Sequence, residues 1–235
     1  MLMIWDGIAA AAGLLMRGDA SVVEIAVLSL QVSGVATLLA LLTGIPAGSL
    51  LALTRFPGRG LLVSLVNTGM GLPPVIVGLF VTVLLWRESV LGFLHLLYTP
   101  GAIVGAQLII AFPIDTGLTM AALQALNPRL SLQIVALGAS RPQLLLLLLR
   151  EAKLPLLAAV MAGFGGVISE VGAVIMVGGN IKGQTRVLTT ATVLETRMGN
   201  FEMAIALGIL LLILTFAVNV TLTRIQQRAP KWPTS

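Results

Sequence analysis

Of the 235 residues, 57% are hydrophobic and only 10% are charged, which excludes a soluble globular domain, because such domains carry about 25% charged residues. The chain contains no cysteine, which excludes disulfides, thiolate metal sites and cysteine nucleophiles. The net charge of +5 comes from basic residues scattered between apolar segments, a pattern that predicts topology signals in a membrane protein and not a nucleic-acid-binding surface.

The predicted membrane helices follow in chain order. Residues 1–20 contain an apolar stretch that is too short to cross a bilayer, and we expect it to lie on the membrane surface as an interfacial helix. Five longer apolar segments follow, each near or above the roughly 20 residues that one crossing needs. They cover 22–53, 61–86, 102–123, 154–177 and 201–222.

Basic residues predict the orientation of these spans, because the face richer in Lys and Arg is cytoplasmic. The richer face holds Arg55, Arg59, Arg129, Arg141, Arg150, Lys153, Arg224, Arg228 and Lys231. The other face holds Arg17, Arg87, Lys182, Arg186 and Arg197. We therefore expect an outside N-terminus and a cytoplasmic C-terminus. The transmembrane domain is then 21–223, with a cytoplasmic loop at 124–153 and a basic tail at 224–235.

The cytoplasmic loop carries several small residues. Ala136, Gly138 and Ala139 would let the surface of another protein approach a helix closely. The alternative is an ordinary amphipathic loop helix, which spacing alone favours.

Three stretches of this sequence carry a resemblance. Residues 72–78 read Leu-Pro-Pro-Val-Ile-Val-Gly, 169–173 read Ser-Glu-Val-Gly-Ala, and 177–183 read Val-Gly-Gly-Asn-Ile-Lys-Gly. With the Gly-Ala pair of the cytoplasmic loop, they resemble the permease subunits of binding-protein-dependent ATP-binding-cassette importers for molybdate and related oxyanions. The stretch 185–196 is most similar to the tungstate-specific branch, and the resemblance covers about 24–222. The family's Glu-Ala-Ala is absent from the loop, and its Leu-Pro arrives four residues late.

This resemblance implies an all-α polytopic bundle of the type I importer permease fold, with about five transmembrane helices and an N-terminal interfacial helix. It implies a tungstate permease in the inner membrane of a prokaryote, with molybdate or sulfate as the alternative substrate. The implied partners are a second copy of the chain, two ATPase subunits, an extracytoplasmic oxyanion-binding protein and membrane lipid, without nucleic acid. ATP and Mg would be used by the ATPase subunits. We expect no cofactor, metal or catalytic residue in this chain.

The resemblance also implies roles for particular residues. The loop that couples to the ATPase would comprise Ala136, Leu137, Gly138, Ala139, Ser140 and Arg141. Candidates for the translocation pathway or its gate are Pro73, Pro74, Asp115, Glu170, Gly172, Asn180, Thr185, Arg186 and Thr189.

Each of these groups has a second interpretation. Prolines inside a span either open the backbone toward a cavity, where N–H groups could face an anion, or simply kink a packed helix. Asp115 and Glu170 either line the pathway or make internal hydrogen bonds, and neither carboxylate is expected to ligate a dianion. The donors near 180–190 either guide an oxyanion or cap a loop against a docked binding protein.

Two other classes of protein remain for comparison. An intramembrane enzyme would need a nucleophile and base or a metal cluster, and a single histidine with two buried acids in different spans supplies neither. A secondary transporter would show inverted repeats and more spans, which are not evident.

Overall fold

The computed structural model describes residues 2–17 and 19–227, and within these residues the regular structure is entirely helical. An all-α fold is therefore confirmed. The helices run in the order α1 Leu2–Arg17, α2 Ala20–Leu53, α3 Arg59–Met70, α4 Pro74–Leu85, α5 Pro100–Gln124, α6 Pro128–Ala136, α7 Arg141–Glu151, α8 Lys153–Ile168, α9 Gly172–Gly178, α10 Leu188–Arg197 and α11 Phe201–Gln227, with a 3₁₀ turn at Gly92–Leu94.

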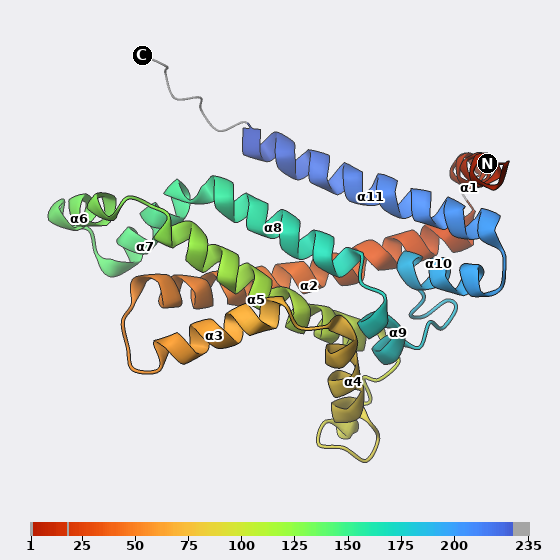
Figure 1. The fold of residues 1–235 in the computed structure, drawn as a ribbon, viewed down its shortest axis with the longest axis horizontal. Helices are drawn as coiled ribbons and strands as arrows, with labels where there is room; N and C mark the ends of the chain where they lie inside the picture. The colour runs from red at the N-terminus through yellow and green to blue at the C-terminus, as the bar shows by residue number, and fades with distance from the viewer. Residues whose placement is uncertain (1, 18, 228–235) are drawn as a thin grey trace.

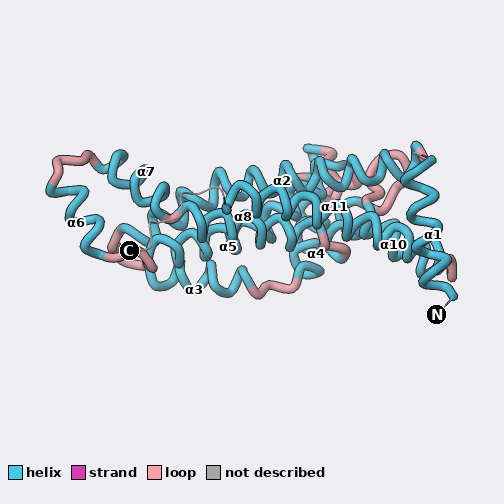
Figure 2. Tube along the Cα trace, turned by 90° about the horizontal axis from the view of Figure 1, so that it is seen from above, coloured by secondary structure: helices cyan, strands magenta, loops and turns pink. Residues whose placement is uncertain are grey.

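Among the described residues, three helices, α2, α5 and α11, are each long and apolar enough to cross a membrane. Two further spans are possible if each bent helix pair counts as one: α3 with α4, bent by 103°, and α8 with α9, bent by 57°. The count of about five spans agrees with the sequence prediction. Figure 1 shows that α4 projects from the bundle, and Figure 2 shows the elongated shape of the bundle from above.

The two bent pairs refine the predicted span boundaries. The break expected at 71–74 is present, because Pro73 precedes α4 in an extended conformation and Pro74 occupies its first turn. The predicted span 154–177 corresponds to the bent pair of α8 and α9, and it contains a break that the sequence analysis did not predict. α8 ends at Ile168 and a separate helix starts at Gly172, which places Glu170 in the break and not inside a helix.

The core forms where α2 crosses α5. The buried positions of α2 are mostly small and recur every three or four residues: Ser29, Val32, Ser33, Ala36, Thr37, Ala40, Gly44, Gly48, Ser49 and Leu51. A Cβ on Gly48 would lie 2.5 Å from the Thr116 carbonyl oxygen. Small residues therefore allow the backbones of α2 and α5 to come into contact. Inside a membrane, this close packing drives helix association in place of the hydrophobic effect.

Helix α1 lies across one end of the bundle against the start of α11 (Figures 1 and 2). At their contact, a Cβ on Gly7 would lie 2.4 Å from the Cγ2 atom of Ile205. This crossing orientation suits the interfacial helix expected in 1–20, and the boundaries 1–20, 21–223 and 224–235 stay predictions.

Two segments outside the predicted spans are helical. The stretch 178–200, between the predicted spans 154–177 and 201–222, contains α10, whose buried Leu188, Thr189, Thr190 and Ala191 pack against the bundle. The basic tail expected at 224–235 begins as the last turn of α11, which continues to Gln227. Residues 228–235 lie outside the described part of the chain.

Candidate functional site

The two helix breaks lie against each other, although about 100 residues separate them in sequence. A Cβ on Gly172 would lie 2.7 Å from the Cγ2 atom of Val75, and one on Gly78 would lie 2.6 Å from the Cα atom of Ala173. Because these two positions are glycine, the backbone of α9 at Gly172 contacts the Val75 side chain, and the backbone of α4 at Gly78 contacts Ala173. The fold thus brings the predicted pathway residues Pro73 and Pro74 close to the break that holds Glu170 and Gly172.

Glu170 caps the helix that follows it. Its Oε1 atom accepts a hydrogen bond from the Ala173 backbone N–H at 3.0 Å, and its carbonyl oxygen accepts one from the Thr189 hydroxyl at 3.0 Å. The carboxylate therefore satisfies an otherwise free donor at the start of α9. Through Thr189 the break is also tied to α10. These bonds favour the packing interpretation of Glu170 and Thr189, while a gating role stays a prediction.

Gln107 is a site residue that the sequence reasoning missed. Its side chain is buried, and its Nε2 atom donates to the Val167 carbonyl oxygen at 2.8 Å and to Ser33 Oγ at 3.3 Å. In a continuous helix the Val167 carbonyl would accept from the N–H of residue 171, but α8 ends at Ile168 and the carbonyl accepts from the Glu170 N–H at 3.2 Å instead. Gln107 therefore supplies a second donor to a carbonyl at the break. The sequence signal that could have identified Gln107 is a polar amide side chain inside the predicted span 102–123.

Asp115 is fully buried inside the α2–α5–α8 junction. Within the described residues neither of its carboxyl oxygens has a hydrogen-bond partner. A Cβ on Gly163 of α8 would lie 2.6 Å from its Oδ1 atom, and one on Gly44 of α2 would lie 3.0 Å from its Cβ atom. The two glycines thus create the space that the carboxyl group occupies. Asp115 therefore lies between packed helices in the single chain and not on an open surface.

The predicted donors after α9 are engaged in hydrogen bonds within their own loop. The Thr185 hydroxyl donates to the Gly178 carbonyl and accepts from the Ile181 N–H at 2.9 Å. The Arg186 guanidinium donates to Asn180 Oδ1 at 3.2 Å and to its carbonyl oxygen at 3.3 Å. Since these bonds hold the loop together, the geometry favours the capping interpretation. A role in guiding an oxyanion stays a prediction for Asn180, Thr185 and Arg186.

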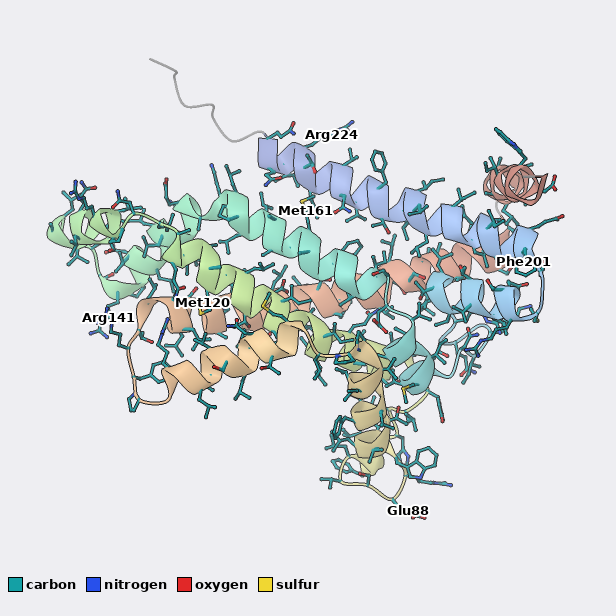
Figure 3. All side chains as sticks on the ribbon, viewed as in Figure 1. Glu88, Met120, Arg141, Met161, Phe201 and Arg224 are labelled. Atoms are coloured by element: carbon teal, nitrogen blue, oxygen red, sulfur yellow. The ribbon has the colours of Figure 1, made fainter. Side chains whose placement is uncertain are left out.

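The loop predicted to couple to an ATPase lies at the end of the molecule opposite α1. It is a helical hairpin, in which 137–140 connect α6 to α7 and Gly138 adopts a left-handed φ of +84°. Gln143 Oε1 accepts from the Ser140 N–H at 2.8 Å and so caps α7. Figure 3 shows Arg141 at this end and Phe201 at the other.

The tip of this hairpin is apolar and exposed. Leu137 is 88% exposed, an unusual environment for an unpaired leucine. A shallow groove of about 410 Å³ opens beside it. The groove is lined by Leu137, Gly138, Ala139, Gln143, Leu146 and Leu147. Five of the hairpin's six predicted coupling residues are exposed and Ala139 is half-buried, so the hairpin presents a surface that another protein could cover.

Comparison with known proteins identifies related sequences. The family described as "Binding-protein-dependent transport system inner membrane component" matches residues 44–231. The tungstate uptake system permease protein TupB of Peptoclostridium acidaminophilum is 40% identical over 227 residues, which cover 97% of this chain and 100% of the relative. The molybdenum transport system permease protein ModB of Escherichia coli strain K12 is 29% identical over 215 residues, covering 85% of this chain and 93% of the relative.

The fold also matches a solved structure. The inward-facing MetNI methionine ABC transporter superimposes with a TM-score of 0.75 at 21% identity, covering 91% of this chain and 98% of that chain. At this identity the likeness establishes the fold, which is that of an ABC importer permease.

Proposed function

This chain belongs to the family of binding-protein-dependent transport system inner membrane components, and from that premise we propose that it is the permease subunit of an ATP-driven tungstate importer. The observation that carries the proposal is the 40% identity to a tungstate uptake permease along 97% of the chain. Molybdate is the alternative substrate, and it is less supported because the molybdenum permease ModB is 29% identical. Tungstate and molybdate share charge and shape, so we expect the binding protein to choose between them.

The exposed hairpin tip supports a docking role toward an ATPase. A leucine such as Leu137 that is 88% exposed gains stability when a partner covers it, at about 25 cal/mol per Å² of apolar surface. The left-handed turn at Gly138 presents it between α6 and α7. We propose that two ATPase subunits, which use ATP and Mg, bind two copies of this hairpin. In this proposal the chain forms the translocation pathway, and the ATPase subunits hydrolyse ATP.

The pathway would lie between two copies of the chain. In one copy α2, α5 and α8 pack around Asp115, and α4 projects from the bundle (Figure 1). We therefore propose a homodimer with the pathway on its two-fold axis. The hairpin would be cytoplasmic and α1 would lie on the outer surface, as the distribution of basic residues predicts. ATP binding would then move the hairpins, and the two breaks would absorb the change.

Transport by the reconstituted assembly tests the substrate. Proteoliposomes that contain the permease, its ATPase and its binding protein should accumulate tungstate only with ATP inside. An excess of molybdate should compete more strongly than sulfate. Uptake of molybdate in preference to tungstate would overturn the substrate assignment, and no ATP-dependent uptake of any oxyanion would overturn the proposal.

A matched pair of glycine variants tests the docking surface. Gly138 and Gly58 share a φ of +84°, and a Cβ at either position would meet no atom within 4 Å. Substitution of each by Arg therefore imposes similar backbone strain, about 1–2 kcal/mol. Only Gly138→Arg places a bulky charge on the hairpin tip, so only this variant should lose the ATPase during co-purification. Equal loss in Gly58→Arg would show that strain, and not the surface, is responsible.

A further inference from the structure

A second pocket lies at the hairpin end of the bundle, and it shares no lining residue with the groove at the hairpin tip. It has a volume of about 520 Å³ and lies where the ends of α2 and α5 meet the start of α6. It is lined by Ala52, Leu53, Thr54, Arg55, Arg59, Leu123, Gln124, Leu126, Asn127, Pro128, Ser131 and Leu148. The volume falls in the range of small-molecule sites, roughly 300–1,000 Å³.

The charge of this pocket is one-sided. Arg55 and Arg59 both line it, and no acidic residue does. Arg59 is half-buried, and its Nε atom donates to the Leu51 carbonyl oxygen at 2.7 Å. This bond fixes the guanidinium group at the pocket wall through a single nitrogen. The terminal nitrogens are left to bind a ligand, and a guanidinium fork matches the oxygens of a phosphate-like group.

Among the other polar groups of the pocket, Asn127 favours an anionic ligand. Its Oδ1 accepts from the Arg129 N–H at 2.9 Å, so its amide nitrogen remains as a donor. The start of the nine-residue helix α6 adds partial positive charge beside it. The hydroxyls of Thr54 and Ser131 donate to carbonyl oxygens of their own chain segments, at 2.6 and 2.8 Å, so they offer no proton to an anion. The donors for an anion are therefore the two arginines and the Asn127 amide.

We propose that this pocket binds a tetrahedral oxyanion group, carried either by an anionic phospholipid head group or by a free oxyanion such as phosphate. The two helix ends that form it, α2 at Leu53 and α5 at Gln124, are ends of membrane spans. The pocket is therefore at the depth of lipid head groups. Basic pockets between transmembrane helices on the cytoplasmic side are suited to anionic head groups.

Binding to the purified permease tests this site. The probes are phosphatidylglycerol, phosphatidylcholine as the neutral control, and sodium phosphate, with retention followed by native mass spectrometry and by thermal shift. We expect phosphatidylglycerol or phosphate to bind and phosphatidylcholine not to bind. Each of Arg55→Gln and Arg59→Gln should weaken binding about five-fold, and the pair about 25-fold. High salt should weaken it further.

Controls separate the pocket from general charge and from folding. Arg150→Gln removes an exposed arginine of α7 that does not line the pocket, and it should leave binding unchanged. Arg59→Lys should keep most of the binding, and the exposed Arg55 can be changed alone if Arg59→Gln does not fold. If phosphatidylglycerol binds and phosphate does not, the ligand of the pocket is the lipid head group. If both probes bind equally, the ligand is the free anion. Unchanged binding in the double variant, or no anion binding to the wild type, would overturn the proposal.

This binding test uses the permease alone, without transport. Its result is therefore independent of whether the assembled importer carries tungstate.

Discussion

The contact between α2 and α5 predicts opposite outcomes for two glycine-to-alanine substitutions on one helix. A Cβ on Gly48 would lie 2.5 Å from the Thr116 carbonyl oxygen and 3.1 Å from the Met120 nitrogen. Both atoms belong to the backbone, so α2 and α5 would have to separate. Overpacking of this kind costs about 1–3 kcal/mol. A Cβ on Gly34 would meet nothing within 4 Å, so Gly34→Ala should be neutral or stabilise by about 0.5–1 kcal/mol.

Thermal unfolding in detergent measures the difference between these variants. For a chain of this length, 1 kcal/mol corresponds to roughly 2–4 °C in Tm, so Gly48→Ala should melt roughly 2–12 °C below the wild type. Gly34→Ala should melt at or slightly above it. Equal Tm values for the two variants would refute the view that close backbone approach at Gly48 holds the bundle together.

Three further predictions concern buried or capping polar groups. Gln107→Met should lower Tm because the buried Val167 carbonyl loses one of its two donors and keeps only the Glu170 N–H, at a cost of about 0.5–1.5 kcal/mol. Ser33→Ala keeps the bond from Gln107 to Val167 and should cost less, and the reverse order would contradict the assignment. Asp115→Asn should not lower Tm, since neither carboxyl oxygen has a hydrogen-bond partner in the described chain. A clear fall in Tm would reveal a hydrogen-bond partner of Asp115 in the assembly. Hydrogen bonds from the first turn of α2 hold the pKa of Asp19 below its ordinary 3.8, so this cap stabilises above about pH 4 and is lost as pH falls through the lower folded pKa. Comparison of Tm against pH with Asp19→Asn, which cannot titrate, measures that loss.

Composition and long apolar segments were enough to predict the helical fold and the approximate spans. A membrane span must be a helix of about 20 mostly apolar residues, and segments of this kind can be recognised directly in the sequence. The break at Pro73 was also predictable, because proline removes a backbone donor and fixes φ. The break near Glu170 was not, since no proline lies between residues 156 and 177 and apolar residues resume after Glu170 up to Val177.

The candidate site was only partly predictable. The resemblance placed Pro73, Pro74, Glu170 and Gly172 in related roles, and the fold brings their two segments into contact. The bond from Gln107 to Val167 depends on helices separated by 60 residues, which no local pattern contains. The donors at Asn180 and Arg186 pair with each other instead of remaining free, because their loop folds back over six residues.

The contact between α1 and α11 has a consequence for how this protein is made. Helix α1 is synthesised before all the other described helices and packs, through Gly7 and Ile205, against α11, which is synthesised after them. Within residues 2–17 and 19–227, no contact joins segments much farther apart in sequence, and such closures come late in folding. The N-terminal helix must therefore wait at the membrane until the whole chain has been inserted. A chain that stops before α11 would leave that helix without its docking site, so protease protection of residues 2–17 would report complete synthesis and insertion.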